Sequence, residues 1–262
     1  MCIVLNVDDR GLLYAEACFE TFRVIHGTIF NWREHEARLR RGLEIFGLEC
    51  PDGLKKLCVV EADRAASDAL VRVTVTGGDA PRGLLPECGR KTGVYIQAWP
   101  YEARTEGIHL RTVLWPLPLY PRPAKLTADY AQTIRGLHEL EDKGLLAKGE
   151  EALVCDAEML YSAPTSNIML FMDGTWMTPN ADSVVPGVVR HTLIEYGVVR
   201  ACPCPHALAE ACEAIALTNS GWFIRPVATI NGRTLRMHGA PFEQLVAVLT
   251  GQAGIPEGLP CA

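Results

Sequence analysis

The segment Trp115-Pro-Leu-Pro-Leu-Tyr-Pro-Arg-Pro-Ala-Lys125 divides the chain and ends on a lysine. Four prolines within nine residues lack amide hydrogens and have a fixed φ, so this segment cannot form a helix or a central strand. We therefore expect an interdomain linker over residues 116–123. A small α/β domain is expected at 1–115 and a larger α/β domain at 124–262, which together make a mixed α+β protein.

In the part of the chain before the linker, the spacing of the apolar residues changes from that of strands to that of helices. Residues 1–30 predict strands, with a hairpin turn at His26-Gly27. Apolar residues on one helical face then predict a helix over 32–47. A second helix is expected over 53–69, and strands are expected at 71–76, 93–98 and 108–114.

The residues after the linker predict a second set of alternating elements. Helices are expected at 127–143, after Pro186-Gly187 as far as Gly197, and at 207–214 and 241–250. Strands are expected at 151–156, 167–172, 215–219 and 226–230, and the Gly- and Pro-rich tail is expected to be loose.

The composition excludes several classes of protein. The chain has 262 residues, of which 48% are hydrophobic and 21% are charged, which is enough apolar material for a large core. A net charge of −6, from 25 basic and 31 acidic residues, argues against a nucleic-acid partner. No apolar run approaches the ~20 residues of a membrane span, and the first ten residues become charged too early for a signal peptide. We therefore expect a cytoplasmic protein without a membrane partner.

The ten cysteines are irregularly spaced and indicate free thiols in a reducing compartment. The cluster Cys202-Pro-Cys204-Pro-His206 offers too few ligands for a tetrahedral metal site. We expect no bound metal.

One of the six lysines stands apart from the others. Lys55, Lys56, Lys91, Lys143 and Lys148 lie in charged or polar stretches that indicate solvated surface positions. Lys125 instead leaves a rigid linker at a domain junction, where desolvation can turn a lysine into a nucleophilic amine.

Two further segments are suited to hold an anion. Val184-Val-Pro-Gly-Val-Val-Arg190 begins a helix, and the amides of Val188 and Val189 would lack intrahelical acceptors. Leu217-Thr-Asn-Ser-Gly221 ends a strand with hydroxyl and small side chains that could complete the anion site.

Six motifs together resemble the class IV aminotransferases, the fold-type IV pyridoxal-phosphate enzymes, and imply a two-domain, D-amino-acid-aminotransferase-like fold. Their order and spacing match the family along nearly the whole chain. The motifs are Phe19-Glu-Thr-Phe-Arg-Val-Ile-His-Gly27, His35-Glu-Ala-Arg-Leu39, Lys125, Ser166-Asn-Ile-Met-Leu170, Thr178-Pro179 and Pro186-Gly-Val-Val-Arg190.

The resemblance implies pyridoxal 5′-phosphate as cofactor and a homodimer whose active site is completed by a loop of the neighbour. It assigns the Schiff base and proton transfer to Lys125. The implied cofactor-binding residues are Arg38, Lys125, Tyr130, Ser162, Val188, Val189, Asn219 and Ser220. Phe19, Arg23 and Arg82 are the implied substrate-binding residues.

Ser162 departs from the family pattern. The family places a glutamate five residues before the asparagine that corresponds to Asn167, where its charge keeps the pyridine nitrogen protonated. A serine cannot carry that charge, so we favour a cofactor with a neutral ring nitrogen. A slipped alignment that uses Asp156 or Glu158, or reduced activity, is the alternative.

The resemblance leaves the reaction open between lyase and transaminase. Thr21, at the acid/base position of 4-amino-4-deoxychorismate lyases, favours formation of p-aminobenzoate and pyruvate for folate biosynthesis, as do Arg82-Gly83, Val189 and Asn219. Tyr130 favours an aminotransferase for branched-chain or D-amino acids. The missing glutamate also permits a degenerate relative without catalysis.

Overall fold

The computed structural model describes residues 6–85, 91–103, 106–252 and 255. The chain forms two compact units, each of which is described by itself. Unit 1 contains Met1–Tyr101 and Pro123–Gln132, and unit 2 contains Glu102–Arg122 and Thr133–Ala262. The expected division at the linker differs from this one, because 102–115 belong to unit 2 and Lys125 belongs to unit 1.

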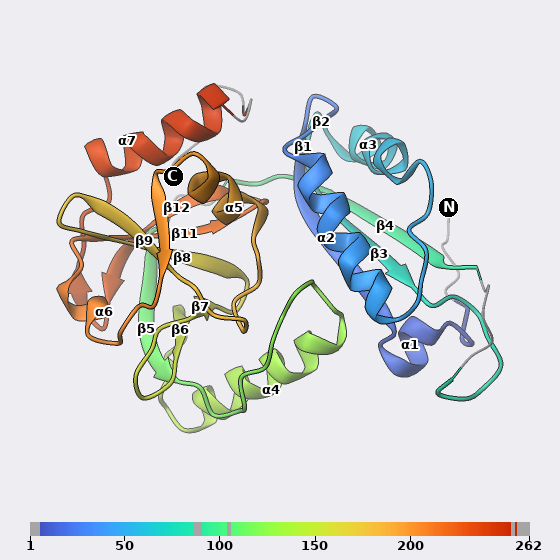
Figure 1. The fold of residues 1–262 in the computed structure, drawn as a ribbon, viewed down its shortest axis with the longest axis horizontal. Coiled ribbons are helices and arrows are strands. Elements are labelled where there is room, and N and C mark those ends of the chain that lie inside the picture. The colour runs from blue at the N-terminus through green and yellow to red at the C-terminus, as the bar shows by residue number, and fades with distance from the viewer. Residues whose placement is uncertain (1–5, 86–90, 104–105, 253–254, 256–262) are drawn as a thin grey trace. The chain divides into compact units, whose positions relative to one another are not determined.

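Unit 1 is a four-stranded antiparallel sheet with two of its helices packed on one face (Figure 1). The strand order is β2-β1-β3-β4, with β1 (Ala17–Ile25), β2 (Thr28–Ile29), β3 (Asp68–Thr76) and β4 (Gly93–Pro100). The helices are α1 (Arg10–Tyr14), α2 (Trp32–Ile45) and α3 (Leu54–Ala65). The hairpin turn lies where it was predicted, with positive φ at His26 and Gly27.

The core of unit 1 lies between the sheet and the helices α2 and α3. Alternate residues of β3 (Ala69, Val71, Val73 and Val75) are fully buried against Leu39, Leu43 and Cys58 of the two helices. The intervening residues of β3 therefore lie on the opposite face of the sheet.

The prediction that residues 1–30 contain only strands is wrong. Residues 10–14 form α1, because the Asp9 side chain accepts the amide of Gly11 and caps the helix. The helix stops after one turn at Ala15, whose φ is positive.

Unit 2 is built on a nine-stranded mixed sheet. Its main path runs β10-β9-β8-β11-β12-β5-β6, while β7 pairs with β8 and β13 pairs with β12. The strands are β5 (Ile108–Leu114), β6 (Glu150–Cys155), β7 (Ser162–Ala163), β8 (Ser166–Met172), β9 (Thr175–Pro179), β10 (Val199–Cys202), β11 (Ala214–Asn219), β12 (Phe223–Ile230) and β13 (Arg233–Thr234).

The helices of unit 2 follow the predicted positions closely. They are α5 (Val188–Glu195), α6 (Leu208–Ala211) and α7 (Ala240–Ala247), which continues as a π-helical turn over Val248–Gln252. The helix α4 (Ala128–Asp142) begins in unit 1 and ends in unit 2. The residues of β8 and β11 that face the core are fully buried, including Ile168, Leu170, Ile215 and Leu217.

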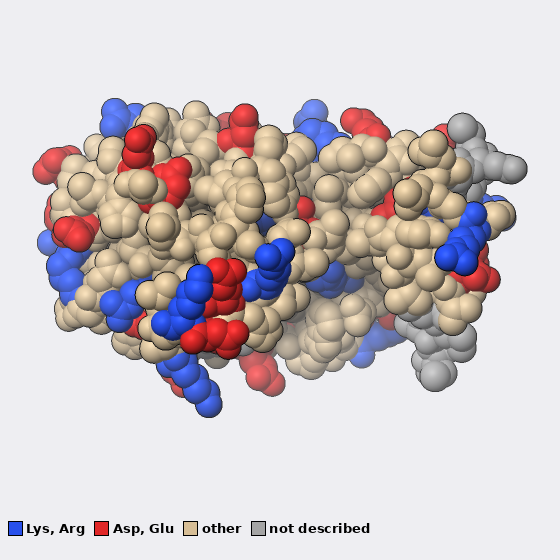
Figure 2. Space-filling view, turned by 90° about the horizontal axis from the view of Figure 1, so that it is seen from below, with Lys and Arg blue, Asp and Glu red and all other residues tan. Residues whose placement is uncertain are grey.

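Charges of both signs are mixed on one face of the molecule. On the face shown in Figure 2, Lys and Arg stand beside Asp and Glu, and no stripe of one sign crosses it. Among the helices of the described residues, none is both long and apolar enough to cross a membrane. Of the tail that was predicted to be loose after residue 250, Gly251 and Gln252 end the π-helical turn, and residues 253–254 and 256–262 lie outside the described part.

Candidate active site

Lys125 is held by the backbone of β1. The Lys125 carbonyl accepts the amide hydrogen of Phe19 at 3.0 Å, and the Thr127 amide donates to the Ala17 carbonyl at 3.0 Å. The lysine therefore lies on a short segment that pairs with β1 of the unit 1 sheet. These two bonds, at the Lys125 carbonyl and at the Thr127 amide, restrict the backbone at and just after the lysine, which is what a reacting amine requires.

Aromatic rings lie beside the Lys125 amine. Its Nζ is 5.5 Å from the centroid of the Phe19 ring, which stacks on Tyr130 with centroids 5.0 Å apart and planes at 22°. Since side chains alternate along a strand, Thr21 lies on the same face of β1 as Phe19. The structure thus brings Lys125, Phe19 and Tyr130 together within unit 1, and Thr21 shares their face of β1.

Arg72 joins this face, and the sequence did not reveal it. Its guanidinium carbon lies 4.0 Å from the Phe19 centroid and 5.3 Å from the Tyr130 centroid. Arg72 pairs directly with Thr21 across β1 and β3, and its Nε donates to Thr74 at 3.3 Å. Among the described residues, no carboxylate forms an ion pair with Arg72. A half-buried guanidinium without a carboxylate partner is suited to bind an anionic ligand.

Arg38 lies in a buried ion pair on the helical side of the same sheet. Its Nε and one terminal nitrogen each donate to the Glu20 carboxylate at 2.7 Å. The same carboxylate contacts Nδ1 of His35 at 2.7 Å, and none of the three side chains is more than 2% exposed. The sequence predicted Arg38 as a phosphate ligand but did not reveal Glu20, which orients its guanidinium.

The charges of this triad are set by opposing effects. Burial alone would raise the pKa of Glu20, but the ion pair and hydrogen bonds with Arg38, together with the His35 contact, hold it well below the usual range. Burial lowers the pKa of His35 despite its contact with Glu20. His35 is therefore neutral and donates from Nδ1, while its buried Nε2 has no hydrogen-bond partner.

The structure does not bring Arg23 and Arg82 to the lysine amine by any described contact. Arg23 pairs with the carboxylate of Asp68 and stacks over the Tyr101 ring, with 3.6 Å between its guanidinium carbon and the ring centroid. Arg82 lies on an exposed loop.

The start of α5, in unit 2, has no side-chain cap over the amides that were predicted to hold an anion. Gly187 caps the helix and offers no side chain, so the amides of Val188 and Val189 lack intrahelical acceptors. A Cβ at Gly187 would lie 2.0 Å from Oδ1 of Asn167, whose amide nitrogen donates to the Val185 carbonyl at 2.9 Å. A side chain at Gly187 would therefore force Asn167 or the helix start to move, and Asn167 fixes the turn before the helix.

A buried hydroxyl faces the same region. Thr218 pairs with Asn167 across β11 and β8, so both side chains lie on the face that packs against α5. The Thr218 hydroxyl is buried and has no hydrogen-bond partner. Buried polar groups without partners are rare, and a phosphate on the α5 amides would satisfy this one. Ser220, 7% exposed, lies two residues farther along the same chain segment.

Asn219 organises the loop that follows β11. Its Oδ1 accepts the amides of Gly221 and Trp222 at 2.9 and 3.2 Å, and its Nδ2 donates to the Thr165 carbonyl at 3.4 Å. Through these three hydrogen bonds, Asn219 holds the loop that contains Ser220.

Arg190 anchors α5 to the sheet. Its Nε donates to the Thr178 hydroxyl at 3.3 Å and a terminal nitrogen donates to the Pro179 carbonyl at 2.8 Å. The Thr-Pro and Pro-Gly-Val-Val-Arg motifs thus meet, and they fix the helix whose first amides form the anion site.

Ser162 lies directly opposite Asn167, the asparagine of the Ser166-Asn-Ile-Met-Leu170 motif. It pairs with Asn167 across β7 and β8. Asp156 is engaged elsewhere, because its carboxylate accepts the Tyr161 hydroxyl and the amide of Met159. These bonds lower the pKa of Asp156, led by the one from Tyr161. The slipped alignment through Asp156 has no support in this geometry.

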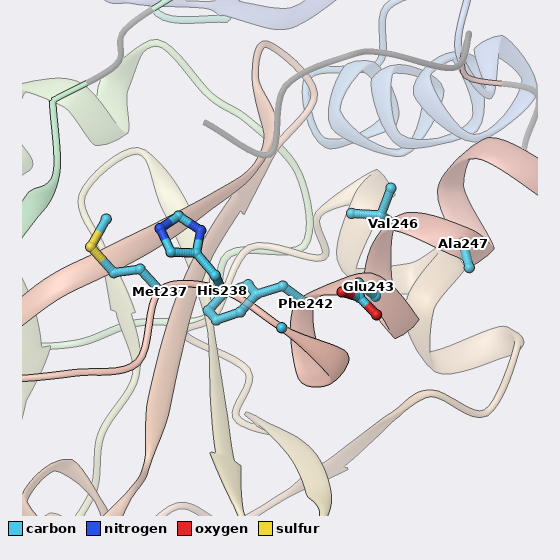
Figure 3. Close-up of a pocket in the computed structure, with 7 residues that line it drawn as sticks. Met237, His238, Phe242, Glu243, Val246 and Ala247 are labelled. Carbon is cyan, nitrogen blue, oxygen red and sulfur yellow. The ribbon is translucent and has the colours of Figure 1, made fainter.

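A separate pocket of about 400 Å³ lies beside α7 (Figure 3). None of the predicted site residues lines it. Its lining comes from one stretch of the chain, namely Met237, His238, Gly239, Phe242, Glu243, Val246 and Ala247. In the part of the chain that the structure describes, no three His, Cys, Asp or Glu side chains gather as metal ligands.

The family of the chain follows from comparison of its sequence with family models. The model of amino-transferase class IV matches residues 17–230, which include the lysine segment, the triad and the α5 site. The chain belongs to the class IV aminotransferases. As a member of this family it is a pyridoxal-phosphate-dependent enzyme, and the α5 amides with the unpartnered Thr218 hydroxyl fit the phosphate of that cofactor.

Curated relatives carry aminotransferase names. A probable branched-chain-amino-acid aminotransferase of Rickettsia conorii is 28% identical over 202 residues, covering 73% of this chain and 68% of the relative. A D-alanine aminotransferase of Listeria innocua is 24% identical over 250 residues, covering 87% of this chain and 83% of the relative.

Solved structures share the fold across both classes of activity. A putative 4-amino-4-deoxychorismate lyase from Legionella pneumophila superposes with a TM-score of 0.81 at 22% identity and covers 96% of each chain. A branched-chain amino acid aminotransferase from Escherichia coli gives 0.79 at 21% identity, covering 95% of this chain and 89% of that one. At these identities the likeness establishes the mixed α+β fold and does not select a reaction.

Proposed function

We propose that this enzyme is a pyridoxal-phosphate-dependent lyase that converts 4-amino-4-deoxychorismate to p-aminobenzoate and pyruvate. The observation that carries the proposal is the place of Thr21. Its side chain lies on the same face of β1 as Phe19, whose ring is next to the Lys125 amine, and it stands directly opposite Arg72. A hydroxyl, an amine and an unpaired guanidinium on one sheet face suit a substrate that carries both an amine and a carboxylate.

Each residue has a stated task in this proposal. Arg72 binds a substrate carboxylate through its terminal nitrogens, and Phe19 with Tyr130 holds that guanidinium in place. Lys125 takes a proton at Nζ from the carbon that bears the substrate amine. The ring carbon–oxygen bond on the neighbouring carbon then breaks, and the Thr21 Oγ1 donates a proton to the departing enol of pyruvate. When bound, pyridoxal phosphate withdraws the electron pair from that carbon.

The proposal gives cofactor roles to residues of each unit, taken unit by unit. The aldehyde end of the cofactor is assigned to Lys125, and its phosphate to the amides of Val188 and Val189 with the hydroxyls of Thr218 and Ser220. Glu20 orients Arg38, which the family resemblance assigns to the same phosphate. Because Ser162 carries no charge, the ring nitrogen is proposed to stay neutral.

A Thr21→Val variant tests the proposal. Valine keeps the shape of the side chain and removes only the hydroxyl, so cofactor binding should be unchanged. We expect formation of p-aminobenzoate to fall by about 10²–10⁴-fold, the range for one general acid–base group. A Thr21→Ser variant keeps the hydroxyl and should retain most of the rate. Equal rates in the wild type and Thr21→Val would remove Thr21 from the reaction.

An aminotransferase is the second candidate, and Tyr130 favours it. Its ring is fixed by Phe19, and the curated relatives carry aminotransferase names. Purified protein would then transfer the amino group of a branched-chain or D-amino acid to 2-oxoglutarate. Transfer without p-aminobenzoate formation would favour this candidate over the lyase.

A non-catalytic relative is the third candidate, which rests on Ser162 alone. Borohydride reduction of protein loaded with pyridoxal phosphate, followed by peptide mapping, should place the label on Lys125. A colourless protein that takes up no added cofactor would overturn both catalytic candidates. The family resemblance also supports a homodimer, which light scattering of the purified protein tests.

A further inference from the structure

A row of three polar side chains crosses the face of the unit 1 sheet on which Arg72 lies. Arg72 of β3 pairs with Thr21 of β1 on one side and with Gln97 of β4 on the other. Residues directly opposite each other on neighbouring antiparallel strands have Cβ atoms about 4.5–5.5 Å apart, so each of these side chains adjoins the next. We call Thr21, Arg72 and Gln97 the polar row.

Gln97 is directed away from the core of unit 1. Its neighbours on β4, Ile96 and Ala98, pack against the core beneath the helices, and alternation along the strand puts Gln97 on the opposite face. Gln97 is exposed, and its side-chain amide has no hydrogen-bond partner among the described residues. This amide is therefore available to a ligand that binds at Arg72.

The contacts of Arg72 leave its two terminal nitrogens for a ligand. Its Nε donates to the Thr74 hydroxyl at 3.3 Å, and the ring centroid of Phe19 lies 4.0 Å from its guanidinium carbon. A guanidinium binds a carboxylate through two parallel hydrogen bonds, and each carboxylate oxygen keeps a further lone pair. The Nε2 of Gln97, beside Arg72, can donate to one of these lone pairs.

The chemistry of the proposed reaction selects which substrate carboxylate lies at the polar row. 4-Amino-4-deoxychorismate has a carboxylate on its ring and another on its enolpyruvyl group, and only the second belongs to the fragment that leaves. Thr21 is the proposed acid for that fragment, and it stands directly opposite Arg72. A hydroxyl that protonates the departing enol of pyruvate must be next to that fragment. The carboxylate nearest to Arg72 and Gln97 is then the one on the pyruvate fragment.

We propose that Gln97 is a specificity-determining residue that binds, together with Arg72, the carboxylate of the pyruvate fragment. This inference rests on the proposed function and assigns one of the two substrate carboxylates within it. The Gln97 Nε2 donates to a carboxylate oxygen, while the terminal nitrogens of Arg72 bind both oxygens. A substrate with an apolar side chain offers no acceptor to these donors, so the polar row selects for a carboxylate at this position.

Two variants of Gln97 and one control are suited to the test. Gln97→Leu removes the amide and keeps a side chain of similar size, and since the position is exposed the variant should melt like the wild type. Gln97→Glu puts a carboxylate beside Arg72, where it would pair with the guanidinium and repel the carboxylate of the ligand. Gln244→Leu is the matched control, because it makes the same substitution at an exposed position of α7 in unit 2.

Product inhibition of the holoenzyme separates the two fragments of the substrate. Pyruvate and p-aminobenzoate are added in turn while the enzyme converts 4-amino-4-deoxychorismate. In Gln97→Leu the inhibition constant of pyruvate should rise about tenfold, the effect of losing one hydrogen bond to a charged group, while that of p-aminobenzoate stays unchanged. KM for the substrate should rise with kcat little changed, because the contact is made before and during the reaction. Gln97→Glu should weaken pyruvate inhibition further, and Gln244→Leu should match the wild type.

Two outcomes of the inhibition assay would overturn the inference. They are equal inhibition of the wild type and Gln97→Leu by pyruvate, and an equal loss of inhibition by both products, which a general disturbance of the sheet would cause. A wild-type protein that makes no p-aminobenzoate would instead contradict the proposed function. Pyruvate binding to the holoenzyme, measured by saturation-transfer NMR, needs no turnover and then tests Gln97 by itself. Weaker binding in Gln97→Leu than in Gln244→Leu would support the carboxylate contact, and equal binding would overturn it.

Discussion

A methyl group at Gly187 should displace the start of α5 and weaken cofactor binding. The Cβ of Gly187→Ala would lie 2.0 Å from Oδ1 of Asn167, which is well inside van der Waals contact. The φ of Gly187 is −64°, so alanine meets no backbone strain and the effect is purely steric.

The size of the effect follows from these contacts. Overpacking of this kind destabilises a protein by about 1–3 kcal/mol. If Asn167 moves to relieve the clash, its 2.9 Å hydrogen bond to the Val185 carbonyl breaks. Such a bond contributes about 1 kcal/mol. Release by moving α5 instead shifts the amides of Val188 and Val189. Since about 1.4 kcal/mol is a factor of ten, we expect pyridoxal phosphate to bind at least about tenfold more weakly.

The assay is a titration of apoprotein with pyridoxal phosphate, followed by absorbance, together with a thermal melt. A double variant, Asn167→Ala with Gly187→Ala, removes the oxygen that causes the clash and should recover part of the affinity that Gly187→Ala loses. Unchanged affinity in Gly187→Ala would refute the assignment of the phosphate to α5. A double variant no better than Gly187→Ala would refute the steric reasoning.

Further perturbations test other parts of the account. Arg72→Met removes the unpaired guanidinium and should raise KM for the carboxylate substrate at least about tenfold, since a charged hydrogen bond contributes about 1.5–3 kcal/mol; an unchanged KM would exclude Arg72 from binding. Glu20→Ala leaves the Arg38 charge buried without its partner and should lower the free energy of unfolding by about 3–5 kcal/mol in urea. The lowered pKa of Glu20 means that its stabilisation is present above the ordinary carboxyl pKa and is lost on acidification, so the wild type should lose melting temperature more steeply below about pH 4 than Glu20→Gln. Burial raises the pKa of Cys58 and Cys204 to about 12, so both thiols should resist iodoacetamide at pH 8 until urea is added, and rapid native labelling would contradict their burial.

Much of the fold was predictable because, within individual helices and strands, the apolar residues recur with a clear spacing. The strand over 108–114 matches β5, and the helix over 32–47 covers α2, because each has an apolar pattern and a definite stop. The short helix α1 was not predictable, because its one turn depends on the Asp9 cap more than on an apolar face.

The division of the chain depends on pairing that local sequence does not encode. The prolines mark a break, but Pro123–Gln132 joins unit 1 because the segment around Lys125 pairs with β1. The partners in that pairing are more than a hundred residues apart, so no local pattern reveals them.

The sequence predicted the site residues that belong to a recognisable motif. It missed those whose role depends on a contact with residues distant in the sequence. Lys125, Phe19 and Tyr130 were expected and lie together. In the sequence, Arg72 occupies the polar position of an alternating strand and looks like an ordinary solvent-facing residue. Only its place over the rings of Phe19 and Tyr130 indicates a role in ligand binding. Glu20 was missed because its partner Arg38 lies 18 residues away on a helix.

The most direct measurement is incubation of purified protein, loaded with pyridoxal phosphate, with 4-amino-4-deoxychorismate. The proposed function predicts p-aminobenzoate and pyruvate in equal amounts from the wild type, and neither product from Lys125→Ala that binds the cofactor. Absence of p-aminobenzoate, with amino transfer to a keto acid by the same sample, would contradict the lyase.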